Sequence, residues 1–179
     1  MDSPELIERH IVLLLGVERR ALPSMLHLQK EMFLLSNLKE SLKEELNFEK
    51  HYYGPYSQVL DESIKNPLHL SNAFDFENKK ILLTASGQRE FLKMIKEYSS
   101  EKKFLDLISS IKLLRGLYDK LSGDELLFLI YKTYPKYTEF SKISDRLIKN
   151  VNIKNRILGS LLSKGVITEK RYGELKNER

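Results

Sequence analysis

Cysteine is absent from the 179 residues of this chain, which excludes disulfide bonds and thiolate metal sites. There are only four histidines, at positions 10, 27, 51 and 69, and no two of them are three or four residues apart. A separation of three or four residues would place two histidines on one helix face as metal ligands. Because no pair has it, we expect no metal site, and we also expect no cofactor. The lack of cysteine agrees with a reducing cytoplasm, which is the location that we expect.

Long apolar runs and a basic leader are also missing. The longest apolar run, residues 11–15, is far too short to cross a membrane. The N-terminus carries Asp2, Glu5 and Glu8 where a signal peptide would have a basic start. We therefore expect neither a membrane segment nor a secretory signal.

The chain does have the composition of a globular protein. Hydrophobic residues make up 41% of it and charged residues 31%, which is typical of a folded protein with a charged surface. Its length is enough for one large domain or two small ones with a real core.

Charge is distributed unevenly along the chain. Residues 1–99 hold 13 basic and 15 acidic side chains, a net charge of −2, whereas residues 100–179 hold 17 and 10, a net charge of +7. A basic C-terminal half points to nucleic acid or to an acidic protein partner. The alternative is that these lysines simply solvate helix faces.

Residues 1–99 have the pattern of a small helical domain with a hairpin. Helices are predicted at 3–16, 24–37, 57–65 and 85–98, with a short helix or extension at 38–45 and a strand at 48–53. Residues 74–76 and 81–83 flank a polar turn and predict a β-hairpin. Helices, a hairpin and a closing helix in this order predict a winged-helix-like domain over residues 1–99.

Residues 100–179 are predicted to be a basic, all-helical region. A helix of about five turns begins near residue 102, and a capping box of Ser122 and Glu125 begins another, which Pro135 ends. A further turn or two is expected at 143–148. The region ends in a helix-turn-helix-like pair, 153–162 and 168–176, with Gly165 at the left-handed position after the first helix.

Aromatic, glycine and proline residues crowd together only in residues 51–57, His-Tyr-Tyr-Gly-Pro-Tyr-Ser. Proline fixes its own φ and restricts the residue before it, so a Gly-Pro pair breaks regular structure. The three tyrosines predict a rigid aromatic corner between the second and third helices of the domain.

Two short motifs give the first half of the chain a resemblance to a known family. Leu28-Gln29-Lys30 in an apolar helix, followed some twenty residues later by Tyr53-Gly54-Pro55-Tyr56-Ser57, is similar to the pattern of Panacea-domain proteins over about residues 5–95. These are SocA-like antitoxins and related phage-associated and archaeal proteins. Many antitoxin members have Tyr-Gly-Pro-Val at the corner, so this chain is nearer the phage-associated branch. The segment 155–168 also resembles the helix-turn-helix tails of small archaeal antitoxins.

The resemblance implies a non-enzymatic protein that binds another protein, which in some relatives is a toxin. It places the partner-binding site at Lys30, Tyr53, Gly54, Pro55, Tyr56 and Ser57. The alternative is that the tyrosine rings pack on the core and only fix the turn. For Lys30, we expect the side-chain stem to cover apolar surface while the ammonium group stays in water.

Two other functions compete with protein binding. An enzyme centred on His51 would need a partner such as Ser57 or Asp61, but a capping serine and a surface aspartate explain both, so we expect no enzyme. A DNA-binding regulator would not use the third helix, because Asp61 and Glu62 would face phosphates. It would use the basic C-terminal helices instead, through Lys149, Lys154, Arg156, Lys164, Lys170 and Arg171. The sequence leaves a homodimer open.

Overall fold

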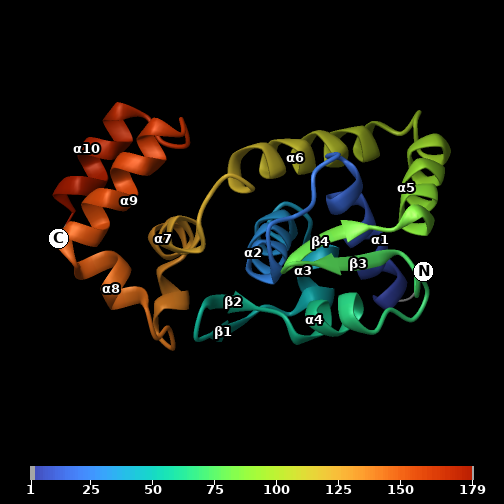
Figure 1. The fold of residues 1–179 in the computed structure, drawn as a ribbon, viewed down its shortest axis with the longest axis horizontal. Helices are drawn as coiled ribbons and strands as arrows, with labels where there is room; N and C mark the ends of the chain where they lie inside the picture. The colour runs from blue at the N-terminus through green and yellow to red at the C-terminus, as the bar shows by residue number, and fades with distance from the viewer. Residues whose placement is uncertain (1–2, 179) are drawn as a thin grey trace. The chain divides into compact units, whose positions relative to one another are not determined.

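In the computed structural model, which describes residues 3–178, the chain is mainly helical, as the sequence predicts. The described residues form ten α-helices, one short 3-10 helix and two antiparallel hairpins (Figure 1). The elements are α1 (Ser3–Gly16), α2 (Met25–Ser36), α3 (Glu40–Leu46), β1 (Glu49–His51), β2 (Gly54–Tyr56), α4 (Gln58–Lys65), β3 (Phe74–Glu77), β4 (Lys80–Leu83), α5 (Ala85–Glu97), α6 (Lys102–Tyr118), α7 (Gly123–Thr133), η1 (Pro135–Thr138), α8 (Ser144–Lys149), α9 (Val151–Ser163) and α10 (Glu169–Asn177). None of the helices in this part of the chain is both long and apolar enough to cross a membrane.

The chain divides into two compact units. The first consists of the described residues up to Phe48 together with Ser57–Asp119, and the second consists of Glu49–Tyr56 and the residues from Lys120 onward. The boundary expected from the sequence lay between residues 99 and 100. The structure instead groups α6 with the first unit, because Ile108 and Ile111 of this helix are buried in the first unit's core.

Helix α1 is the centre of the first unit. It contacts α3, α4, α5, α6 and β4, so apolar side chains are buried around its whole circumference. Glu8 is buried in the same helix, and its carboxylate accepts hydrogen bonds from the backbone N–H groups of Leu68, His69 and Leu70. This contact satisfies the buried charge and attaches the loop after α4 to α1.

Helix starts in the first unit coincide with the capping residues that the sequence indicates. Ser24, Ser57 and Thr84 precede α2, α4 and α5, and each side chain accepts a hydrogen bond from the backbone N–H three residues later. These bonds satisfy amides that have no partner inside the helix.

The predicted hairpin of the first unit is confirmed as β3 and β4, with Phe74 opposite Leu83 and Glu77 opposite Lys80. Its two-residue turn, Asn78 and Lys79, has positive φ at both positions, which matches the right-handed twist of paired strands. Beyond the hairpin, the backbone of Leu22 exchanges two hydrogen bonds with that of Ile81 in β4.

A buried ionic cluster joins α6 to the end of α1. Arg115 is fully buried, and its guanidinium donates to the backbone oxygens of Leu14 at 2.6 Å and Arg20 at 2.9 Å. It also donates to both carboxylate oxygens of Asp119, at 2.8 and 2.9 Å. Glu31, also fully buried, lies 4.0 Å from Arg115 Nε. Burial and the neighbouring Asp119 carboxylate raise the pKa of Glu31 to about 9, so the folded protein holds Glu31 protonated at neutral pH.

The second unit combines the β1–β2 hairpin with the C-terminal helices. The hairpin packs on η1 and α7, and the capping box of Ser122 and Glu125 begins α7 as predicted. Helices α9 and α10 form the predicted C-terminal pair. Gly165 follows α9 at φ 65°, and Val166 N–H donates back to Leu161 O, which confirms the left-handed helix end.

The aromatic corner differs from its predicted form. The sequence predicts a strand at 48–53 that enters a turn between two helices, whereas residues 49–56 form a complete hairpin with His51 opposite Gly54. The prediction missed β2 because it contains Gly-Pro. Pro55 lies in a strand of a two-stranded hairpin, where a missing N–H is tolerated.

Candidate binding sites

The turn of the β1–β2 hairpin presents two tyrosines. Tyr52 and Tyr53 form its two-residue turn, and they are 48% and 50% exposed. Gly54 has φ 77°, a left-handed backbone conformation that side chains with a Cβ disfavour. The glycine of the motif is therefore needed to turn the chain directly after Tyr53.

Aromatic stacking stiffens this hairpin. The His51 ring is stacked on that of Tyr56, with centroids 4.7 Å apart, and lies 4.9 Å from the Tyr52 ring. On Tyr52, the Lys142 ammonium lies 3.7 Å from the ring centroid, and the Lys142 backbone N–H donates to Tyr52 O at 3.1 Å. Lys50 of β1 forms an ion pair with Glu139. The turn is thus held from both strands and from the segment after η1.

Gln29, which is not among the predicted partner-binding residues, links the two motifs of the family resemblance. Its side-chain amide donates to Ser57 O at 2.9 Å, and its carbonyl oxygen accepts from Ser57 N–H at 2.8 Å. Both residues are buried, and the Ser57 hydroxyl caps α4 by accepting from Leu60 N–H. The pair of hydrogen bonds therefore fixes the start of α4 on α2, within the first unit.

Lys30 differs from its prediction. We expected its ammonium group to stay in water, but the side chain is buried. The residue is only 2% exposed, and burial lowers the pKa of Lys30 to about 7. The cause is its place on α2, where residues 27–33 are all buried. The six expected partner-binding residues are also divided between units. Lys30 and Ser57 belong to the first unit, and residues 53–56 belong to the second.

The three residues considered for catalysis have structural contacts of their own. His51 stacks on tyrosine rings, Ser57 is buried as a helix cap, and Asp61 forms an ion pair with Lys65 at 2.6 Å. His51 and Ser57 belong to different units. Among residues 3–178, no three His, Cys, Asp or Glu side chains are arranged to hold a metal ion.

The six basic residues expected to bind DNA have different surroundings. Lys154 is buried, and its ammonium donates to Glu178 O at 2.6 Å. Three others are paired with carboxylates: Lys149 with Asp145 at 2.8 Å, Lys164 with Glu125 at 2.6 Å, and Arg171 with Glu174 at 3.0 Å. Arg156 and Lys170 are exposed, one on α9 and one on α10.

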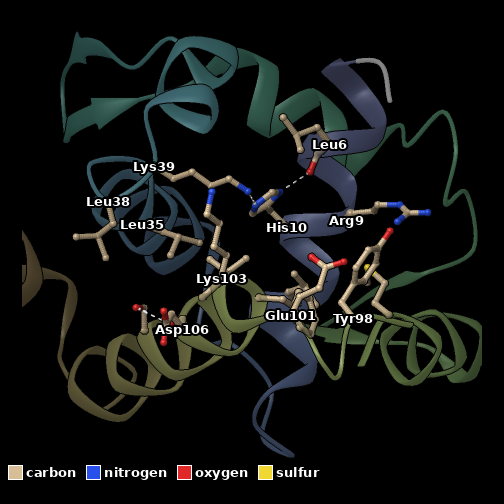
Figure 2. A pocket seen from close by; sticks show the side chains of 15 residues that line it. Leu6, Arg9, His10, Leu35, Leu38, Lys39, Tyr98, Glu101, Lys103 and Asp106 are labelled. Carbon is tan, nitrogen blue, oxygen red and sulfur yellow. Dashed lines mark hydrogen bonds between the residues drawn. The ribbon is translucent and has the colours of Figure 1, made fainter. Parts of the chain in front are cut away.

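A pocket of about 520 Å³ opens in the first unit, between α1, the segment after α2, the end of α5 and the start of α6 (Figure 2). This volume is in the range of small-molecule sites. Much of its wall is apolar and is formed by Leu6, Leu13, Leu35, Met94, Phe104 and Leu107. The pocket is therefore suited to a ligand with an apolar body.

Polar groups in the pocket centre on His10 and Lys39. His10 Nδ1 lies 2.7 Å from Leu6 O, so this nitrogen carries the proton and donates. Nε2 is then free to accept from the Lys39 ammonium, 3.2 Å away. Burial lowers the pKa of His10 to about 4, so its imidazole is neutral at pH 7 and offsets none of the charge on Lys39.

The pocket could not be predicted from the sequence, because its walls come from residues 6–110 and only the tertiary fold assembles them. The local signal is the polar run Glu8-Arg9-His10, which lies between apolar residues of α1. No family model, curated protein or solved structure matches this chain.

Proposed function

We propose that this chain is a non-enzymatic protein-binding module whose contact surface is the turn of the β1–β2 hairpin. The observation that carries the proposal is the half-exposed pair Tyr52 and Tyr53 at its tip. Tyrosine is enriched in protein interfaces because it buries a large area at a small cost in side-chain entropy.

The rigidity of the hairpin supports the proposal. Gly54 and Pro55 restrict the backbone, and the His51–Tyr56 stack and the Lys142–Tyr52 contact restrict the rings. A surface that is ordered before binding loses less entropy when a partner docks, so more of the contact energy is available as affinity.

A Panacea-like, winged-helix-like fold of the first unit belongs to the same proposal. Helices α1, α2 and α4, followed by the β3–β4 hairpin and its bridge to Leu22, support the winged-helix arrangement. The Gln29–Ser57 contact supports the resemblance, because it gives a physical reason for the two motifs to occur together. A partner protein, with a toxin encoded by a neighbouring gene as the first candidate, follows from this family.

Helix α4 would be the recognition helix of such a domain, and its charges favour a protein partner over DNA. Asp61 pairs with its own helix's Lys65, and Glu62 is exposed. With two carboxylates and one ammonium group, the helix carries a net charge of −1, which is unfavourable next to a phosphate backbone.

Co-expression of the chain with the products of its neighbouring genes tests the proposal. We expect a co-purifying complex whose affinity falls at least about tenfold in Tyr53→Ala, as for a central aromatic contact. Phe76→Ala is the matched control, because Phe76 is 45% exposed on the other hairpin and should leave the affinity unchanged. Equal affinity of Tyr53→Ala and the wild type would show that the turn is not the contact surface.

The alternative is a DNA-binding transcriptional regulator that uses α9 and α10. It rests on the exposed Arg156 and Lys170 and on the basic charge of this region. We expect such binding to weaken steeply with salt and to be lost in Arg156→Glu/Lys170→Glu, with the Tyr53→Ala variant unaffected. No shift of DNA mobility at low salt would exclude it.

A further inference from the structure

The Lys39 ammonium in the pocket of the first unit is half-buried and has no acidic partner among the described residues. Its hydrogen bond goes to the neutral His10 ring, and no carboxylate of residues 3–178 lies within ion-pair distance of it. Burial lowers the pKa of Lys39, which is the sign of an ammonium that has lost water without gaining a counter-charge. An anion placed here would supply that counter-charge.

A second cation reaches the same part of the pocket. Figure 2 shows the Lys103 side chain extending from α6 toward the region where Lys39 meets His10. Arg9 also lines the pocket but pairs with Glu5 at 3.1 Å. Two carboxylates line it as well, those of Glu101, which precedes α6, and of Asp106 in α6. Because Arg9 is paired with Glu5, the remaining two ammonium groups and two carboxylates of the lining balance in number. The site for an anion is therefore local, at the two lysines, where Lys39 has only the neutral His10 ring as its hydrogen-bond partner.

We propose that this pocket binds a small amphipathic carboxylate, such as a fatty acid of medium length, with its carboxylate between Lys39 and Lys103. The hydrocarbon part would lie against the apolar wall that includes Leu35, Met94 and Phe104. The ligand then matches both properties of the pocket: burial of its chain contributes the hydrophobic term, and its charge pairs with the desolvated ammonium. This site lies wholly in the first unit and is independent of the proposed hairpin surface.

Isothermal titration of the full chain with decanoate tests this inference. We expect one site per chain, and an affinity that falls about tenfold or more in Lys39→Met, since a hydrogen bond to a charged group is lost. Lys39→Arg should keep most of the affinity. Lys93→Met is the matched control, because Lys93 is an exposed lysine of α5 outside the pocket. Thermal unfolding of each free variant shows whether it is folded.

The ligand series separates the charged and the apolar contributions. Decanol has the same chain without the charge, and acetate has the charge without the chain, so both should bind at least about tenfold more weakly than decanoate. Equal binding of decanoate and decanol, or of the wild type and a folded Lys39→Met variant, would overturn the inference. So would binding of decanoate at many weak sites with no saturation at one per chain.

Discussion

Gln29 and Glu31 lie two residues apart on α2, and both side chains are buried and polar. The free-energy cost of burial is offset by hydrogen bonds at Gln29 and by protonation at Glu31. Gln29 makes two hydrogen bonds to the backbone of Ser57, so its polar atoms are satisfied. Within the described residues, neither carboxylate oxygen of Glu31 accepts a hydrogen bond, and its raised pKa keeps it protonated next to Asp119. A protonated carboxyl can donate to the Asp119 carboxylate, which explains why it is tolerated there.

Replacement of Gln29 should destabilise the first unit. In Gln29→Ala the buried N–H of Ser57 loses its partner and the Ser57 C=O keeps only the Asp61 N–H, which we expect to lower the free energy of unfolding by about 2 kcal/mol. Urea denaturation followed by circular dichroism measures this change. Gln58→Ala removes an exposed glutamine one residue beyond Ser57 and should change stability by less than about 0.5 kcal/mol. A loss of similar size in both variants would contradict the role given to Gln29.

Glu31 should make stability fall as pH rises. The unfolded chain releases this proton near pH 4.5, whereas the folded protein holds it to about pH 9, so between these values only the folded state binds it. The stabilisation is thus complete below pH 4.5 and is lost as pH rises toward 9. Gln cannot ionise, so the stability of Glu31→Gln relative to the wild type should increase by about 1 kcal/mol per pH unit in this window.

Denaturant unfolding at pH 5, 6, 7 and 8 measures that increase. Glu44→Gln is the control, because it makes the same replacement at an exposed residue of α3. A Glu31→Gln profile parallel to that of the wild type would show that Glu31 is ionised in the folded state.

Among the secondary-structure elements, helix starts are fixed by side-chain caps, whereas the β1–β2 turn and the end of α9 are fixed by backbone conformation. Ser24, Ser57, Thr84 and Ser122 begin four helices through side-chain caps. The β1–β2 hairpin instead depends on the positive φ of Gly54. The end of α9 likewise depends on the positive φ of Gly165.

Two glycines of the second unit separate the effect of positive φ from that of helix propensity. Gly159 lies inside α9 and Gly165 follows its end at φ 65°, and a Cβ would meet no atom within 4 Å at either position. We expect Gly159→Ala to stabilise the protein by about 0.5–1 kcal/mol through helix propensity, and Gly165→Ala to destabilise it by about 1 kcal/mol through backbone strain. Thermal unfolding measures both. Shifts of the same sign would indicate that backbone conformation is not the deciding factor.

At the scale of the whole molecule, the two compact units are interleaved in the chain. The second unit takes Glu49–Tyr56 from the middle of the N-terminal half and joins it to residues from Lys120 onward. Within this unit the hairpin packs on η1 and α7, and Lys142 N–H donates to Tyr52 O. The C-terminal region therefore does not contain all the parts of its own unit.

A fragment of residues 120–179 should be less well protected than the same residues in the full chain. It lacks the hairpin, so the Lys142 amide loses its acceptor and one face of η1 and α7 becomes solvated. Hydrogen exchange should be faster by about tenfold or more at η1 and Lys142 in the fragment, whereas α10, which packs on α9, should change less. Equal protection at η1 would mean that the hairpin adds nothing to this unit.

Much of the fold could be predicted from local sequence, because its signals act over a few residues. The caps of α2, α4 and α5, the β3–β4 hairpin and the α9–α10 pair all follow from such signals. The site residues could not be predicted in the same way. Lys30 is buried and Lys154 donates to Glu178 O, and neither environment is visible in the neighbouring sequence.

Local sequence signals account for the mainly helical fold, for the starts of most helices and for the sharp turn of the chain at residues 51–57. Each depends on propensity, capping or φ restriction, which act within one or two turns of chain. Three features come from tertiary packing instead: the pairing of β1 with β2, the hydrogen bonds of Gln29 to Ser57, and the contact of His10 with Lys39 in a pocket. These contacts join residues that are distant in the chain, and the packing of the whole core selects them.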